Sequence, residues 1–174
     1  MISMSGYWDP HIERMPIEDL HSLQEDRLKF IVRYVYDHSS FYRQRFKEAR
    51  VEPDDIMGLS DLTKLPFTKK VDLRNSYPIG MFSLPMSRVV RYHVSSGTTG
   101  KPTVVGYTED DIDSWTESLA RAMTSIGLGR GDVVQVGYGY GLFTGGLGLH
   151  YGAERIGATV LPTGTGNTER QIEL

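Results

Sequence analysis

The chain has 174 residues, 39% of them hydrophobic and 24% charged, with a net charge of −3 at pH 7. A weakly acidic chain with no basic stretch is not typical of a nucleic-acid-binding protein. It contains no cysteine, which excludes disulfides and thiolate zinc sites.

Nothing in the chain predicts a membrane protein or a secreted one. The N-terminus lacks the apolar core of a signal peptide. The long uncharged stretch, residues 133–153, contains seven glycines, which argues against a membrane span. We therefore expect a cytoplasmic protein without nucleic acid or membrane as a partner.

The first half of the chain predicts short helices. Residues 16–38 form the first, because apolar side chains recur there at roughly helical spacing and Pro16 suits a first turn. A second helix is predicted over residues 40–49. Prolines and a glycine then break the chain, and Thr68 is expected to cap a short helix that holds Val71 and Leu73.

A loop rich in hydroxyl groups and glycine follows, between β-like segments at residues 88–94 and 103–107. It contains Ser95, Ser96, Gly97, Thr98, Thr99, Gly100, Lys101, Pro102 and Thr103. Its N–H groups, hydroxyls and lysine have the composition of a polyphosphate cradle. It is not a Walker A loop, because two residues rather than four separate its glycines and proline follows the lysine. Composition alone leaves a simple hairpin loop as the alternative.

From residue 108 onward the pattern predicts an α/β fold. Thr108 is a good N-cap for a helix that Gly127 ends, and Asp110 and Asp111 are charges at the start of that helix. A buried strand at residues 132–136, a helix at 147–156 and a strand at 158–161 predict a parallel pair with a crossover helix. Residues 168–171 fit a capping box that begins a last helix.

The glycine-rich segment at residues 137–148 follows the first of these strands. It therefore belongs at the carboxyl edge of the sheet, where open α/β sheets bind ligands. Tyr138, Tyr140 and Phe143 offer flat walls for an aromatic acid, and the alternative is that these rings belong to the core. His93 is interpreted as a strand residue, and the other histidines have no metal-ligand spacing, so no metal site in the protein is predicted.

The order of residues in the loop, S-S-G-T-T-G-K-P-T, resembles the phosphate-binding loop of adenylate-forming enzymes, which include the acyl- and aryl-CoA ligases. Residues 65–82, 138–148 and 150–162 are similar to segments of the phenylacetate-CoA ligases. The resemblance therefore runs along nearly the whole chain.

This resemblance assigns roles to particular residues. The loop Ser95–Thr103 would hold the β- and γ-phosphates of ATP, and Lys101 would add positive charge during adenylation. Tyr138 and Phe143, with Tyr140 beside them, would line the aryl-acid pocket. Lys70 would reach towards the phosphates, although a solvated charge at a helix start is an equal alternative.

The resemblance also implies a fold and an activity. Residues 1–87 would form a small, mainly helical subdomain, and residues 88–174 the first part of the large ATP- and acid-binding α/β domain. The whole enzyme would convert phenylacetate, ATP and CoA to phenylacetyl-CoA, AMP and pyrophosphate, with Mg²⁺ on the phosphates.

The expectation is thus an N-terminal part of a longer ligase, inactive by itself. The adenine site and a catalytic lysine would lie beyond residue 174. Three questions stay open at this point. The acid could instead be an indole or hydroxybenzoate acid. The chain could be a non-catalytic nucleotide-binding module. The protein could also form a homodimer.

Overall fold

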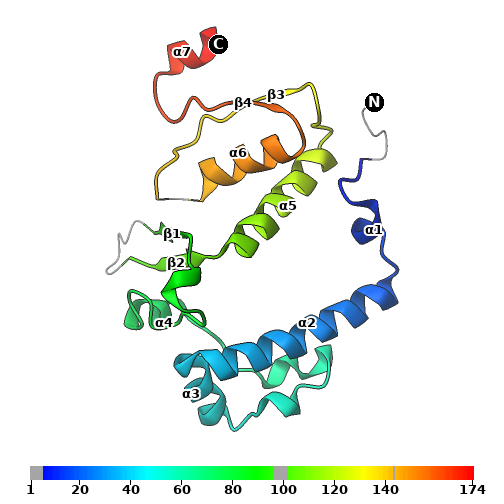
Figure 1. Cartoon of the computed structure of the whole chain (residues 1–174), viewed down its shortest axis with the longest axis vertical. Helices are drawn as coiled ribbons and strands as arrows, with labels where there is room; N and C mark the ends of the chain where they lie inside the picture. The colour runs from blue at the N-terminus through cyan, green and yellow to red at the C-terminus, as the bar shows by residue number, and fades with distance from the viewer. Residues whose placement is uncertain (1–5, 96–101, 143) are drawn as a thin grey trace. The chain divides into compact units, whose positions relative to one another are not determined.

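The computed structural model describes residues 6–95, 102–142 and 144–174 (Figure 1). The chain divides into two compact units. One unit comprises residues 15–90 and 95–106, and the other comprises residues 1–14, 91–94 and 107–174. We call them the helical unit and the α/β unit. In the part of the chain that the structure describes, no helix is long and apolar enough to cross a membrane.

The helical unit is built from short helices around one small core. Its elements are α2 (Ile17–His38), α3 (Ser40–Ala49), η1 (Pro53–Asp55), η2 (Leu59–Lys64), α4 (Lys70–Asn75) and η3 (Met86–Arg88). The core consists of Val32, Phe46, Val51 and Ile56. Ser39 ends α2 and caps α3, because its hydroxyl accepts a hydrogen bond from the Tyr42 N–H. The two predicted helices are confirmed.

The sequence did not indicate which apolar residues of α2 are buried. Ile17 and Ile31 are 61% and 48% exposed, whereas Val32 is buried. One detail of the helical unit differs from the prediction. Thr68 does not cap α4. The extended backbone of Lys69 starts the helix one residue later, and the Asp72 carboxylate accepts a hydrogen bond from the Lys69 N–H at 2.7 Å. A carboxylate inside the first turn has replaced the hydroxyl cap.

We expect Asp61 to make the stability of the helical unit depend on pH. Its carboxylate pairs with the Lys64 ammonium at 2.8 Å and accepts a hydrogen bond from the Met57 N–H. These contacts lower the pKa of Asp61, with Lys64 the larger cause. A lowered pKa stabilises the fold above the usual carboxyl pKa, and this stabilisation is lost as the pH falls through the pKa of the folded state.

The measurement is thermal unfolding of Asp61→Asn beside the native chain. The native melting temperature should be higher at pH 7, and the difference should shrink as the solution is acidified below the usual carboxyl range. The exposed Asp26 in α2 gives a matched control, Asp26→Asn, with little difference at either pH. A difference that stays constant with pH would contradict the role given to Asp61.

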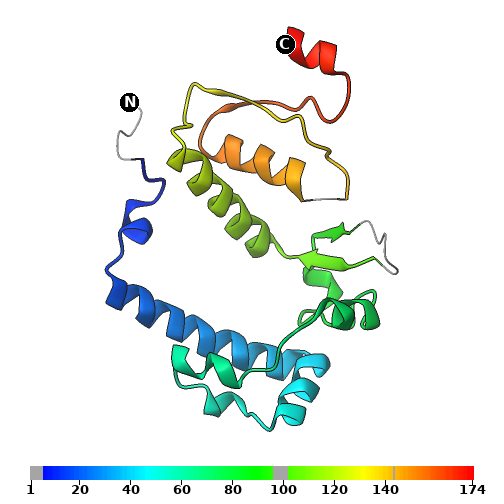
Figure 2. The same cartoon turned by 180° about the vertical axis from the view of Figure 1, so that it is seen from behind.

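The α/β unit has a core between helices and a parallel strand pair. Its elements are α1 (Pro10–Glu13), β1 (Arg91–Val94), α5 (Glu109–Ser125), β3 (Val133–Gln135), α6 (Gly145–Arg155), β4 (Thr159–Leu161) and α7 (Thr168–Glu173). In both views α6 lies beside α5, with β3 and β4 running over it (Figures 1 and 2). The buried core residues are Ala120, Met123, Ala153, Ile156 and Ala158.

The predicted strand–helix–strand unit is confirmed. Strands β3 and β4 pair in parallel, with Val133 opposite Thr159 and Gln135 opposite Leu161. Strand β2 (Val104–Tyr107) follows the hydroxyl-rich loop. The prediction that residues 132–136 form a buried strand is wrong for one face, since Val133 is 66% exposed while Val136 is 1% exposed. The α6 helix covers only the face that Val134 and Val160 share with the core.

The predicted ends of α5 are also confirmed. The Thr108 hydroxyl accepts a hydrogen bond from the Asp111 N–H at 3.1 Å, and the Asp111 carboxylate accepts one from the Thr108 N–H at 2.8 Å. At the other end Gly127 has a φ of +91°, a conformation that glycine adopts without strain. The Leu128 N–H then donates to the Met123 carbonyl at 3.1 Å, which closes the helix.

The predicted capping box at the start of α7 does not form. Asn167, with a φ of +50°, precedes the helix and makes no side-chain cap. The Gln171 amide donates instead to the carbonyls of Gly164 and Gly166. Both glycines have positive φ, and the turn that results directs their carbonyls at the glutamine.

Candidate functional site

The base of the hydroxyl-rich loop is closed by a pair of hydrogen bonds. The Ser95 N–H donates to the Thr103 carbonyl at 2.9 Å, and the Thr103 N–H donates to the Ser95 hydroxyl at 2.8 Å. The loop therefore leaves and returns at one point. Ser96, Gly97, Thr98, Thr99, Gly100 and Lys101 lie outside the described residues, so the predicted phosphate cradle stays a prediction.

Gly106 and Lys70 belong to the same helical unit as Ser95 and Thr103. Gly106 lies against the ring of Phe82, where an added Cβ would come within 2.7 Å of a ring carbon, so a larger residue here would displace that ring. Lys70 is the first residue of α4, and its side chain is exposed. The structure thus places Lys70 at a helix start and on the surface. This position is compatible with a solvated charge and with a reach towards phosphates.

The glycine-rich segment of the α/β unit lies where the sequence predicted it. Residues 137–142 follow β3 after Val136, and the chain after β4 returns to the same edge. The Gly164 N–H and the Thr163 hydroxyl both donate to the Val136 carbonyl, at 3.0 and 3.2 Å. Segments that follow two parallel strands therefore meet at the carboxyl edge, the usual place for ligands in an open α/β sheet.

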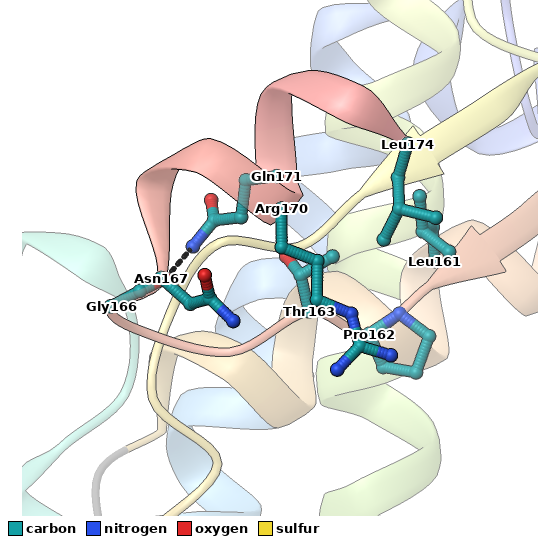
Figure 3. A pocket seen from close by; sticks show the side chains of 8 residues that line it. All are labelled: Leu161, Pro162, Thr163, Gly166, Asn167, Arg170, Gln171 and Leu174. Atoms are coloured by element: carbon teal, nitrogen blue, oxygen red, sulfur yellow. Dashed lines mark hydrogen bonds between the residues drawn. The ribbon is translucent and has the colours of Figure 1, made fainter.

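A hollow of about 270 Å³ opens beside this edge (Figure 3). The side chains of Leu161, Pro162, Arg170 and Leu174 form part of its wall, and the Gln171 amide holds the turn beneath it. The wall combines apolar surface with the Arg170 guanidinium. Of the residues that the sequence predicted for the acid pocket, the two that the structure describes, Tyr138 and Tyr140, do not line this hollow.

The two described aromatic residues of the glycine-rich segment have different environments. Tyr138 is 58% exposed, and its ring lies over Gly145, where an added Cβ would be 2.6 Å from a ring carbon. Tyr140 is half-buried, and its hydroxyl lies 3.1 Å from Nδ1 of His150. Phe143 lies outside the described residues. The acid-binding role of all three stays a prediction.

Tyr140, His150 and Glu154 form a row of three polar groups, and the last two of these lie on α6. The His150 Nε2 lies 3.2 Å from the Glu154 carboxylate, which needs a proton on that nitrogen when the ring is neutral. Nδ1 then accepts the hydrogen bond that the Tyr140 hydroxyl donates. Burial, and to a lesser extent the Glu154 charge, raises the pKa of Tyr140, so its hydroxyl stays protonated at neutral pH.

Sequence reasoning missed two histidines that hold this segment. His150 orients Tyr140, and His93 in β1 contacts the Leu142 carbonyl through Nδ1 at 3.0 Å. No spacing in the sequence indicates either contact, because the partners lie on separate elements. Within the described residues no group of three histidines or acids could hold a metal ion.

Comparison with known proteins identifies the relatives of this chain. No family model matches it. The phenylacetate-coenzyme A ligase of Pseudomonas putida is 54% identical over 166 residues, which are 95% of this chain and 38% of the relative. The enzyme of the same name from Escherichia coli K12 gives the same values, and that from Thermus thermophilus is 53% identical over 167 residues. This chain is a relative of the phenylacetate-coenzyme A ligases.

Solved structures confirm the predicted fold class. A crystal structure of 2-hydroxyisobutyryl-CoA ligase with 2-HIB-AMP and CoA superposes with a TM-score of 0.91 at 33% identity, covering 98% of this chain and 38% of that one. An open conformation of the same ligase gives 0.90 at 32% identity. The chain therefore has the fold of part of a CoA ligase, and it spans about 38% of the length of the curated relatives it matches.

Proposed function

We propose that this chain is the N-terminal part of an ATP-dependent ligase that joins an aryl acid, most directly phenylacetate, to CoA. One observation carries the proposal, namely 54% identity to phenylacetate-coenzyme A ligases along 95% of the chain. The 33% identity to a ligase of a small hydroxy acid is clearly lower. We therefore favour an aromatic acid over an aliphatic one.

The reaction would run in two steps. The acid carboxylate attacks the α-phosphorus of ATP, and pyrophosphate leaves. The CoA thiol then attacks the carbonyl carbon of the acyl-adenylate, and AMP leaves. In this scheme Ser95–Thr103 contributes hydroxyl and N–H donors to the phosphates, and Lys101 contributes charge where it develops on the leaving pyrophosphate. The closed base formed by Ser95 and Thr103 supports such a loop, because it fixes the point from which the donors extend.

Mg²⁺ belongs to the proposal as an ion carried by the ATP phosphates. The described residues hold no group of three acids or histidines able to ligate it, and magnesium commonly binds through phosphate oxygens and water. The division into residues 1–87 and 88–174, a reach of Lys70 towards the phosphates, a cytoplasmic location and a homodimer also stay predictions.

The test is ATP–pyrophosphate exchange by the full-length protein with a panel of acids. We expect exchange that requires phenylacetate, and AMP release that requires CoA in addition. Indole acids, hydroxybenzoate acids and 2-hydroxyisobutyrate are assayed in the same way as alternative acid substrates. Faster exchange with one of these would replace phenylacetate, and ATP binding without exchange with any acid would favour the non-catalytic nucleotide-binding module.

Phe143 connects the assay to the predicted acid pocket. Phe143→Ala should raise KM for phenylacetate at least tenfold, because an aromatic ring contributes about 1.5–3 kcal/mol when it is buried against a ligand. KM for ATP should stay within about twofold. Phe67→Ala, at a residue 84% exposed, is the matched control. Equal effects on acid and ATP, or none, would return Phe143 to a structural role.

A further inference from the structure

Strand β1 holds the glycine-rich segment at one carbonyl group. The Leu142 carbonyl accepts two hydrogen bonds, from the Val94 N–H at 3.1 Å and from Nδ1 of His93 at 3.0 Å. A carbonyl has no proton to donate, so Nδ1 carries the hydrogen in this contact. His93 therefore has to be the Nδ1–H tautomer or fully protonated.

The surroundings of His93 hold its ring in place. The residue is 5% exposed, and its ring meets the rings of Tyr107 and Trp115 edge to face, at centroid distances of 5.2 and 5.7 Å. Its Nε2 is buried and has no hydrogen-bond partner among the described residues. An unpartnered buried nitrogen costs free energy. An apolar side chain would avoid that cost, so the benefit of an imidazole here lies at Nδ1.

The backbone of the segment that His93 contacts makes few hydrogen bonds. Gly137, Gly139 and Gly141 alternate along it, and glycine has the largest backbone freedom to lose. Within the described part of the chain, the backbone hydrogen bonds of residues 137–142 all fall on the Leu142 carbonyl. Leu142 immediately precedes Phe143, the residue proposed to contact the acid. The His93 contact thus fixes the backbone next to that residue.

We propose that His93 is a positioning residue for the acid-binding segment. Its Nδ1–H orients the Leu142 carbonyl and so holds the backbone of the segment that carries Tyr138 and Tyr140. This inference rests on the proposed function for its effect on acid binding, while the hydrogen bond itself belongs to the fold.

The test separates the hydrogen bond from the ring. In the full-length protein, His93→Phe keeps an aromatic ring and loses the donor. His93→Asn loses the ring but keeps an N–H at the position of Nδ1. We expect His93→Phe to raise KM for phenylacetate about five- to tenfold, the effect of one lost hydrogen bond, with KM for ATP within about twofold. His93→Asn should recover most of the affinity for the acid. His21→Phe, at an exposed histidine, is the control for replacing a histidine by phenylalanine.

A second measurement needs no variant and no activity. Nitrogen-15 NMR of the native protein labelled at histidine should show the neutral Nδ1–H form of His93, or the doubly protonated ring, with a hydrogen bond from Nδ1. Finding the Nε2–H tautomer would overturn the proposal, whether or not the variants fold. The proposal would also be overturned if His93→Asn raised KM for phenylacetate as much as His93→Phe does. An equal rise in KM for ATP would overturn it as well. Absence of acid-dependent exchange by the native protein would instead refute the proposed function, and the tautomer would still decide the contact.

Discussion

Replacing Lys101 with alanine in the full-length protein should lower the rate of acyl-adenylate formation about 100-fold, the usual loss when one preorganised charge or donor is removed from a developing negative charge. The two ends of the loop meet at Ser95 and Thr103, and Lys101 lies two residues before Thr103 in the sequence. Gly97→Ala should also slow the reaction, because a side chain restricts the backbone of the cradle.

The measurement is ATP–pyrophosphate exchange at saturating acid. Lys29→Ala, at an exposed lysine of α2, is the matched control and should leave the rate unchanged. Native exchange rates in both loop variants would show that residues 95–103 form a simple hairpin connection and contribute nothing to adenylation.

Gly152→Ala should destabilise the α/β unit by about 1–3 kcal/mol, the usual cost of overpacking. Gly152 is buried on α6 where the helix crosses α5, and an added Cβ would lie 2.5 Å from Cβ of Leu119 and 3.1 Å from its backbone carbonyl carbon. Neither atom belongs to a flexible side-chain end, so the helices must move apart. Alanine in place of glycine otherwise favours a helix by up to about 1 kcal/mol, and the sign of the effect therefore tests the packing.

Urea unfolding of the full-length protein, followed by the circular dichroism of its helices, gives this free energy. Gly129→Ala is the matched control, because a Cβ at Gly129 meets nothing within 4 Å, and its midpoint should stay close to the native one. A Gly152→Ala protein as stable as the native one, or more stable, would contradict the close approach of α5 and α6.

Much of the local structure followed from signals within a few residues. Thr108 and Asp111 lie three positions apart and cap α5 as predicted, and Gly127 ends that helix. Proline, hydroxyl and glycine signals of this kind act through the backbone of the same turn, so no distant residue is needed to interpret them. The parallel pairing of β3 and β4 followed from the order and spacing of a strand, a helix and a strand along the chain.

Where several side chains compete for the same turn, local signals gave the wrong partner. At α4 both Thr68 and Asp72 could cap, and the carboxylate holds the Lys69 N–H. At α7 the Gln171 amide turned to the Gly164 and Gly166 carbonyls instead of the expected cap. The outcome depended on backbone angles that the residue types alone leave open.

For the candidate site, the sequence determined its residue types and its place at the carboxyl edge of β3. The sequence contains the loop Ser95–Thr103, and its pattern predicted that Tyr138 and Tyr140 follow a strand. Only the tertiary structure decided what holds that segment. His93 and Leu142 are 49 residues apart, and Gly152 meets Leu119 across two helices. Burial and hydrogen-bond partners are set by which surfaces pack together, and that depends on residues far apart in the chain, whereas a cap or a turn depends only on its neighbours.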